Sequence, residues 1–331
     1  MTDEVAVTGA EGFIGSHLVE TLVRRGQRVR AMVLYNMYSS HGWLDALDSD
    51  ILDQVEVVFG DVRDPASVRR LVEGTEVVYH LAALGSVPYS YSAPQSFVDT
   101  NVIGTLHVLE AVRSCGTPRL VHTSTSETYG TARTVPISEG HKLQAQSPYA
   151  ASKIAADKLV ESYYLSFGTP AVVVRPFNTF GPRQSARAVI PAIIIQLAAG
   201  SRQLKLGALD PTRDFSYVTD TAQAFVDLGE APASAVLGEL FNVGPGQDVA
   251  IGQLAEDIAG LMGVEADIIE DAQRLRPKDS EVMRLVCDAS KLRDRTGWQP
   301  RYTRDQGLRE TIEWFLEPGN LARYNPNEYN Q

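Results

Sequence analysis

A short apolar run followed by evenly spaced glycines constrains the fold more than any other feature of the chain. Residues 5–8 have the composition of a buried strand, and Gly9, Gly12 and Gly15 follow it at intervals of three. Such glycines let the backbone turn tightly and approach a pyrophosphate, while the next helix offers free amides at its N-terminus. The pattern predicts a strand, a turn and a helix that could bind a dinucleotide. A glycine trio by itself also fits an ordinary turn.

Five further β-branched runs alternate with helical patterns up to about residue 176. They span residues 28–34, 55–59, 77–81, 120–124 and 171–175. This alternation is typical of a doubly wound parallel sheet. The expected fold class is therefore α/β, with a Rossmann-like sheet.

The remaining sequence predicts a smaller, mostly helical domain. An apolar helix is expected around 190–199, a strand and a helix around 213–225, and amphipathic helix from 251 onward, with a break at 297–300. No linker separates the two parts, so the second domain should be discontinuous and cover the carboxyl edge of the sheet. The expected NAD(P)-binding domain comprises 1–178 and about 214–246, and the substrate-binding domain about 179–213 and 247–331.

Composition excludes several classes of protein. The 331 residues, 44% of them hydrophobic, suffice for a large core, and the net charge of -11 would repel a nucleic-acid backbone. No apolar run is long enough to cross a bilayer and no signal-peptide pattern is present, so we expect a cytoplasmic protein without a membrane partner. Cys115 and Cys287 fit buried thiols, and we expect neither a disulfide framework nor a metal site.

Tyr149 and Lys153 form a candidate acid–base pair. They lie four residues apart and would share one face of a helix. The pKa of a free tyrosine is near 10, and an adjacent ammonium together with a nicotinamide cation could lower it by about three units. Most such pairs lie on solvated helix faces. Here, however, the run at 120–124 leads into Thr125, Ser126 and Glu127, at the strand end where such folds place catalysis.

Eight short stretches extend these observations in a specific order: TGAEGFIGSHL, GDVRD, HLAA, NVIGT, TSTSETYG, YAASK, RPFNTFGPR and RDFSYVTD. Together they resemble the nucleotide-sugar branch of the extended short-chain dehydrogenase/reductase family over nearly the full length. The resemblance implies that Thr125 binds the reacting oxygen of the sugar. It implies that Tyr149 accepts the proton and that Lys153 supports Tyr149 and anchors a ribose.

The resemblance also implies two sets of binding residues. The cofactor-binding set is Gly9, Gly12, Phe13, Ile14, Gly15, Asn36, Asp61, Val62, Leu81, Ala82, Ala83, Asn101, Tyr149, Lys153 and Pro176. The substrate-binding set is Pro88, Thr125, Asn178, Arg187, Val189, Arg213 and Arg276. Arginine suits a diphosphate because its fork binds phosphate oxygens at two points, although each arginine could instead form a surface ion pair.

Glu127 indicates which reaction of this family to expect. Dehydratases resemble this chain in having a threonine, an acid or serine, and then a glutamate. Oxidation at C4 makes the C5 proton acidic, so a positioned carboxylate can remove it before water leaves from C6 and the hydride returns there. Ser126 stands where glucose dehydratases usually have an aspartate, so Glu127 or a bound water is expected to protonate the leaving hydroxyl.

Further stretches, including VLYNMYSSHGWLD and QRLRPKDSEVMRL, resemble the soluble dehydratases of legionaminic-acid-type pathways. The expected activity is therefore 4,6-dehydration of a UDP- or GDP-linked N-acetylglucosamine. The alternatives are a UDP-sugar C4 epimerase, which Glu127 disfavours, and a UDP-glucuronate decarboxylase, whose usual arginine beside Lys153 is missing. A non-catalytic dinucleotide-binding regulator would normally lack Tyr149 or Lys153.

The resemblance favours NAD as the cofactor. NAD-preferring members commonly have an aspartate at the end of the second strand, but residues 33–36 contain no acid here. No arginine cluster follows that would bind a 2′-phosphate, so NADP stays open and Asn36 is the candidate ribose contact. A homodimer through the helices around 92–115 and 148–167 is usual for the family.

Overall fold

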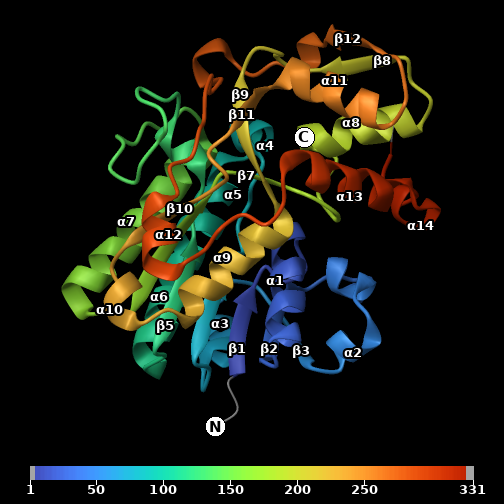
Figure 1. The fold of residues 1–331 in the computed structure, drawn as a ribbon. Helices are drawn as coiled ribbons and strands as arrows, with labels where there is room; N and C mark the ends of the chain where they lie inside the picture. The colour runs from blue at the N-terminus through green and yellow to red at the C-terminus, as the bar shows by residue number, and fades with distance from the viewer. Residues whose placement is uncertain (1–3, 326–331) are drawn as a thin grey trace.

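The computed structural model describes residues 4–325, and its centre is a seven-stranded sheet (Figure 1). Its strands are β1 (Glu4–Thr8), β2 (Arg28–Leu34), β3 (Val55–Gly60), β4 (Val77–His80), β5 (Arg119–Thr123), β6 (Ala171–Pro176) and β10 (Leu240–Val243). They are all parallel, in the order β10-β6-β5-β4-β1-β2-β3. The α/β prediction and the six runs expected as strands are confirmed. Strand order reverses between β1 and β4, and such a point opens a ligand crevice at the carboxyl ends of the strands.

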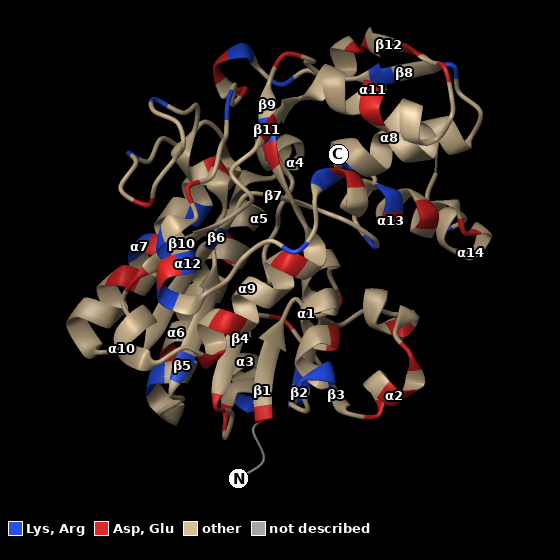
Figure 2. Cartoon of the chain, viewed as in Figure 1, with Lys and Arg blue, Asp and Glu red and all other residues tan. Residues whose placement is uncertain are grey.

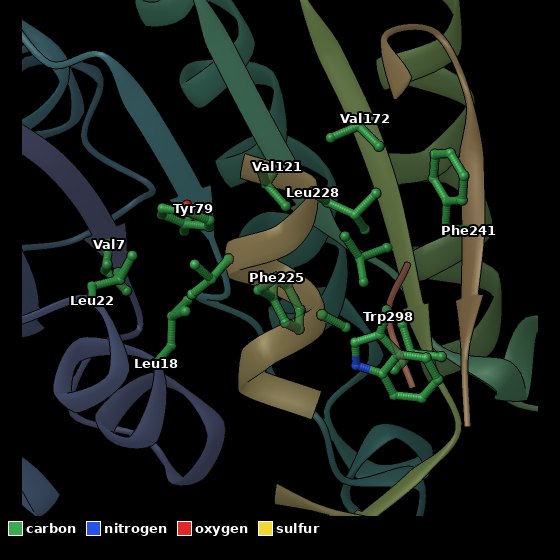
Figure 3. Packing of buried hydrophobic residues seen from close by; sticks show 14 of the residues in the cluster. Val7, Leu18, Leu22, Tyr79, Val121, Val172, Phe225, Leu228, Phe241 and Trp298 are labelled. Atoms are coloured by element: carbon green, nitrogen blue, oxygen red, sulfur yellow. The ribbon is translucent and has the colours of Figure 1, made fainter. Parts of the chain in front are cut away.

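Helices cover both faces of this sheet. The helices α1 (Phe13–Arg24) and α9 (Val218–Glu230) pack on one face, and α3 (Pro65–Val72), α6 (Gly104–Cys115) and α7 (Pro148–Phe167) pack on the other. Alternate residues of a strand point to opposite faces. Val7 accordingly packs in the first core with Leu18 of α1 and Phe225 of α9 (Figure 3), whereas Ala6 packs in the second.

A separate hydrophobic core lies beyond the carboxyl ends of the sheet, at the upper right of Figure 1. Its strands are β7 (Asn178–Phe180), β9 (Thr212–Tyr217) and β11 (Asp248–Ala250) in one sheet and β8 (Gln203–Leu206) and β12 (Asp267–Glu270) in another. Its main helices are α8 (Val189–Ala198), α11 (Ile251–Leu261) and α13 (Arg304–Leu316). Because β9 pairs here, the domain boundary expected at 214 falls inside this strand, and the division into domains stays a prediction.

Short helical segments complete the described chain. They are α2 (Ser49–Leu52), α4 (Val87–Ser92), α5 (Pro94–Phe97), α10 (Ala233–Val236), α12 (Ser290–Thr296) and α14 (Pro318–Leu321), with a π-helical segment at Val98–Ile103. One expectation is wrong: residues 262–289 form β12 and two 3₁₀ turns instead of amphipathic helix. Strand β7, which follows β6, had not been expected either. Both strands form by pairing with segments that are distant in sequence, which local periodicity does not reveal.

The composition-based expectations were compared with the described residues. Neither cysteine forms a disulfide, and Cys287 is buried as expected whereas Cys115 is only half-buried. Among residues 4–325 no cluster of side chains suited to a metal ion occurs, and no helix there has the length and apolarity needed to span a membrane. Segments with Lys and Arg and segments with Asp and Glu are interspersed over the elements seen in Figure 2.

Candidate active site

A cleft of about 790 Å³ runs along the carboxyl ends of the strands where the sheet order reverses. Its walls come from the turn after β1, the ends of β2 to β6, and the start of α4. Segment 184–188 and Arg276 add residues from beyond the sheet. The volume lies within the range of about 300–1,000 Å³ typical of small-molecule sites.

The turn after β1 requires glycines because other backbone segments of the protein lie close to it. Gly9 has a φ of +67°, and a Cβ there would lie 2.7 Å from the backbone nitrogen of Ala82. A Cβ on Gly15 would collide with the carbonyl oxygen of Gly9. No side chain caps α1 at Gly12, so the amides of its first turn face the cleft uncapped. Free amides at a helix N-terminus fit a pyrophosphate.

Thr125, Ser126 and Glu127 follow β5 as expected and line the cleft. The chain leaves the strand through a 3₁₀ turn (Ser126–Tyr129), where the Thr125 hydroxyl accepts a hydrogen bond from the Glu127 amide at 3.3 Å. Ser126 is buried, and the Glu127 side chain is only 13% exposed. The turn therefore positions a hydroxyl and a carboxylate side by side.

Helix α7 brings Tyr149 and Lys153 to the same place. Ser147 caps the helix by accepting a hydrogen bond from the Ala150 amide, which fixes where the helix starts. The Tyr149 ring packs edge-on against Phe97 at a centroid distance of 6.1 Å. The Lys153 ammonium donates to the carbonyl of Thr123 at 2.5 Å. The two side chains lie one helical turn apart on the wall of the cleft.

The net effect of the protein's own groups is to raise the pKa of Tyr149 above its ordinary value. Burial raises this pKa to about 12, while a hydrogen bond with Thr125 acts in the opposite direction and the charge of Glu127 raises it further. Burial also lowers the pKa of Lys153 to about 8, against the charge of Asp157. The expected lowering requires a nicotinamide cation together with Lys153, so it stays a prediction; among the protein's own groups, desolvation has the largest effect on this pKa.

A buried charge network that the sequence did not reveal lies behind Lys153. Asp157, one turn further along α7, accepts hydrogen bonds from Ser124 at 2.6 Å and from Arg175 at 2.5 Å. Burial would raise the pKa of Asp157, but His122 and Arg175 hold it at about 2. The network connects the side of α7 that lines the cleft to β5 and β6. Its members come from three separate segments, so no local motif contains them.

Most of the expected binding residues line the cleft. They are Gly9, Gly12, Phe13, Ile14, Gly15, Asp61, Val62, Leu81, Ala82, Ala83, Pro88, Thr125, Tyr149, Lys153, Pro176, Asn178, Arg187 and Arg276. The side-chain oxygen of Asn178 is buried and has no hydrogen-bond partner within residues 4–325. An unpaired buried oxygen is costly, which suits a position that contacts a ligand.

Two expected cofactor residues lie outside the cleft lining. The amide group of Asn36 is occupied within its own loop: it donates to Leu34 and Ser40 carbonyls and accepts from the amides of Tyr38 and Ser40. Asn101 is buried, bonded to the backbone of Leu84 and to Ser152. Both side chains stabilise the local structure.

Two expected substrate residues also lie outside the lining. Val189 begins α8 and packs on the core beyond the sheet. Arg213 is 5% exposed, and its guanidinium donates to Glu281 at 3.1 Å. Arg276, which does line the cleft, lies 3.8 Å from both Glu127 and Glu281. Glu281 thus links two of the arginines in the expected substrate-binding set.

Sequence reasoning did not identify several residues that line the cleft, among them Glu11, Tyr89, Gln184 and Ser185. Glu11 lies inside the glycine motif, so an acid within a phosphate-binding turn was the available signal. Tyr89 comes from α4, a helix too short to show periodicity. Nothing local distinguishes the other two residues, since tertiary packing brings segment 184–188 to the cleft.

Comparison with known proteins places the chain among nucleotide-sugar enzymes. The sequence model of the family described as GDP-mannose 4,6 dehydratase matches residues 6–311. The dTDP-glucose 4,6-dehydratase of Xanthomonas campestris pv. campestris is 32% identical, and the alignment covers 94% of this chain and 92% of that protein.

Two solved structures are similar over almost their whole length. DesIV, a dTDP-glucose 4,6-dehydratase from Streptomyces venezuelae determined with NAD bound, has a TM-score of 0.87 at 26% identity, covering 98% of this chain and 99% of that one. The UDP-N-acetylglucosamine 4-epimerase from Methanobrevibacter ruminantium M1, in complex with UDP-N-acetylmuramic acid, has a TM-score of 0.83 at 30% identity, covering 96% and 99%.

Proposed function

Because the chain belongs to the GDP-mannose 4,6-dehydratase family of extended short-chain dehydrogenases/reductases, we propose that it is an NAD-dependent nucleotide-sugar 4,6-dehydratase. The substrate of this proposal is a UDP- or GDP-linked N-acetylglucosamine, and the product is its 4-keto-6-deoxy derivative. The observation that carries it is Glu127, a carboxylate on the wall of the cleft next to Thr125 and Tyr149. An epimerase needs no such base, since it removes and returns a single hydride.

Tyr149 accepts the proton of the C4 hydroxyl in this mechanism. Thr125, bonded to Tyr149, holds the oxygen from which that proton leaves. Since burial raises the pKa of Tyr149 to about 12, the phenolate needs positive charge close by. Lys153 supplies part of it from one turn away. Bound NAD supplies a positively charged ring and the chemistry that takes the hydride from C4 and returns it at C6.

Glu127 then removes the C5 proton, which the neighbouring ketone makes acidic. The carboxyl group so formed protonates the hydroxyl that leaves from C6 as water, because Ser126 beside it cannot act as a strong acid. When the hydride returns at C6, C5 takes up one proton. The release of the C4 hydroxyl proton from Tyr149 balances this uptake, so the sum is the loss of one water. Arg276 lies 3.8 Å from Glu127 and lines the same cleft. The proposal assigns Arg276, Arg187 and Asn178 to the substrate diphosphate, whose oxygens match a guanidinium fork.

Three features of the cleft fit a dinucleotide. They are the glycine turn, the uncapped start of α1, and the pair Asp61 and Val62 at the end of β3. The similarity to the UDP-N-acetylglucosamine 4-epimerase of Methanobrevibacter ruminantium supports N-acetylglucosamine as the sugar of the substrate. The dehydratase relatives described as acting on dTDP-glucose support the reaction class but a different nucleotide.

The proposal includes a homodimer formed through the segments at 92–115 and 148–167. Helix α7 exposes Ala151, Ala155 and Leu165 along one face, and the π-helical segment exposes Val98 and Ile103. Exposed apolar side chains on adjacent segments favour a protein–protein contact.

The experiment that tests the function needs no added cofactor. The purified protein is incubated separately with UDP-N-acetylglucosamine and GDP-N-acetylglucosamine, and products are identified by mass spectrometry. We expect loss of one water from one of the two substrates. The variant Glu127→Gln should dehydrate about 10²–10⁴-fold more slowly because it lacks the base. Glu256→Gln, an exposed change on α11, is the matched control and should leave the rate unchanged.

The outcomes separate the alternatives. An isomer of unchanged mass would replace the dehydratase assignment with an epimerase. Full activity of Glu127→Gln would remove Glu127 from the mechanism. Loss of carbon dioxide from UDP-glucuronate, without dehydration of either amino sugar, would favour a decarboxylase.

A further inference from the structure

Glu11 places a carboxylate at the end of β2, although it belongs to the turn after β1. It lies between Gly9 and Gly12, and its side chain lines the cleft. One carboxylate oxygen (Oε1) accepts a hydrogen bond from the amide of Leu34, the last residue of β2, at 3.0 Å. The turn is held in place because the Glu11 carbonyl also accepts from the amide of Trp43 at 3.0 Å.

The second carboxylate oxygen of Glu11 (Oε2) is buried and has no hydrogen-bond partner within residues 4–325. A buried acceptor without a donor costs free energy, and the cost is larger for a charged group. Burial raises the pKa of Glu11, and the Leu34 amide opposes that rise. A ligand that donates hydroxyl hydrogen bonds here would offset the cost and favour the ionised carboxylate.

Among the described residues at this end of the cleft, Glu11 is the best placed carboxylate without an ion-pair partner. Met32, Leu34 and Gly60 line the cleft beside Glu11 and offer no side-chain hydrogen-bond acceptor comparable to a carboxylate. Asn36, the residue favoured from the sequence, has its amide group engaged in its own loop. Asp61 lines the cleft but is paired with Arg63 at 2.5 Å.

We propose that Glu11 binds the 2′- and 3′-hydroxyls of the adenosine ribose and thereby selects NAD over NADP. In dinucleotide-binding folds an acid near the end of the second strand accepts hydrogen bonds from these hydroxyls, and Glu11 reaches that position from a different segment. Two vicinal hydroxyls can donate to one carboxylate, whereas the 2′-phosphate of NADP would bring negative charge against it. The inference rests on the proposed function only in taking a dinucleotide as the ligand.

Dinucleotide binding, measured without any sugar substrate, tests this role. Isothermal titration calorimetry on cofactor-depleted protein gives dissociation constants for NAD⁺ and NADP⁺ separately, and mass spectrometry identifies the dinucleotide that co-purifies. Wild type should co-purify with NAD and bind it far more tightly than NADP. Glu11→Gln should bind NAD about tenfold or more weakly, because a bond to a charged acceptor is lost, and its preference for NAD should shrink at least as much.

Two further variants make the result interpretable. Glu11→Asp keeps the charge on a shorter side chain, so it should still discriminate against NADP. Glu256→Gln removes one negative charge from an exposed position of α11 and should behave as wild type. If Glu11→Gln does not fold, equal binding of NAD and NADP by wild type or by Glu11→Asp overturns the assignment.

The failure of this inference differs from the failure of the proposed function. A Glu11→Gln protein that keeps the wild-type preference for NAD removes Glu11 from cofactor selection and leaves the dehydratase proposal intact. A folded wild-type protein that binds neither dinucleotide refutes the redox mechanism itself.

Discussion

At the scale of single residues, burial controls the chemistry of the cleft more than neighbouring charges do. It raises the pKa of Tyr149 to about 12 and lowers that of Lys153 to about 8. Asp157 is the exception, since its hydrogen bonds and ion pairs overcome burial and hold its pKa at about 2. The sequence identified Tyr149 and Lys153 from their spacing, but burial depends on what covers them in three dimensions.

His17 gives a residue-scale prediction about pH and stability. Its ring nitrogen (Nε2) lies 3.0 Å from the carbonyl of Pro182, and burial, aided by the charge of Arg183, lowers its pKa to about 4. Between pH 6.5 and about 4, His17 is therefore protonated in the unfolded chain but neutral in the folded protein. The free energy of unfolding consequently decreases as the pH falls through this range. The shift of 2.5 units corresponds to about 3 kcal/mol.

Urea unfolding of wild type and His17→Gln at pH values from 4 to 8 measures this effect. Glutamine can still donate to the Pro182 carbonyl but does not titrate. The difference in unfolding free energy between the two proteins should change by about 3 kcal/mol across the range, with wild type losing more at low pH. The two proteins must be compared because other groups also titrate in this range. Burial raises the pKa of Asp214 to about 6, so protonation of Asp214 makes the folded state more stable as the pH falls, in wild type and variant alike. A constant difference from pH 4 to 8 would contradict the prediction.

At the scale of elements, the unit of β1, turn and α1 combines local and tertiary requirements. Gly15 is buried in the first turn of α1 and packs against the Gly9 carbonyl. This close approach holds the turn in the shape that presents the helix amides to the cleft. The glycine spacing predicted the strand-to-helix turn, and the structure adds the contact between its two halves.

Gly15→Ala tests that contact. The added methyl group would collide with the Gly9 carbonyl, so the backbone must shift, and the folded state should lose about 1–3 kcal/mol. Gly260→Ala on α11 is the matched control, because no atom lies within 4 Å of the new Cβ. It should gain about 0.5–1 kcal/mol from the higher helix propensity of alanine.

Thermal or urea unfolding of both glycine variants gives the comparison, and calorimetric titration with NAD adds a second readout. Weaker NAD binding should accompany the loss of stability only in Gly15→Ala. Equal effects of the two substitutions would show that the turn tolerates a side chain at position 15.

At the scale of the whole molecule, the cleft lies where the seven-stranded sheet meets the separate hydrophobic core beyond its carboxyl ends. Two cores pack on the faces of the sheet, and the separate core contains α8, α11 and α13. Trp43 from the loop after β2 contacts Trp314 and Tyr324 near the end of the described chain, with ring centroids 5.5 and 6.2 Å apart. Aromatic contacts of this kind stabilise the packing of the two parts against each other.

The proposed homodimer gives a whole-molecule prediction. Sedimentation equilibrium should give twice the chain mass of 36.1 kDa for the wild type. Ala155→Glu introduces a charge on the exposed face of α7 and should yield a monomer, because burying an unpaired charge in the interface is costly. Ala233→Glu, an exposed alanine of α10, should leave the dimer unchanged. A monomeric wild type, or a dimeric Ala155→Glu, would contradict this arrangement.

The sequence by itself determined the parallel sheet, because β-branched runs alternate with helical patterns and both signals are local. It also predicted the cleft positions of Tyr149, Lys153 and Glu127, since the first two share a helix face and the third follows a strand end. Only the tertiary structure decided that Asn36 and Asn101 support loops and that Arg213 pairs with Glu281. The contact of Glu11 with the end of β2 and the contacts of Asp157 with its partners join segments that are far apart in the chain. Such contacts form only when the whole chain has folded, and local patterns do not contain them.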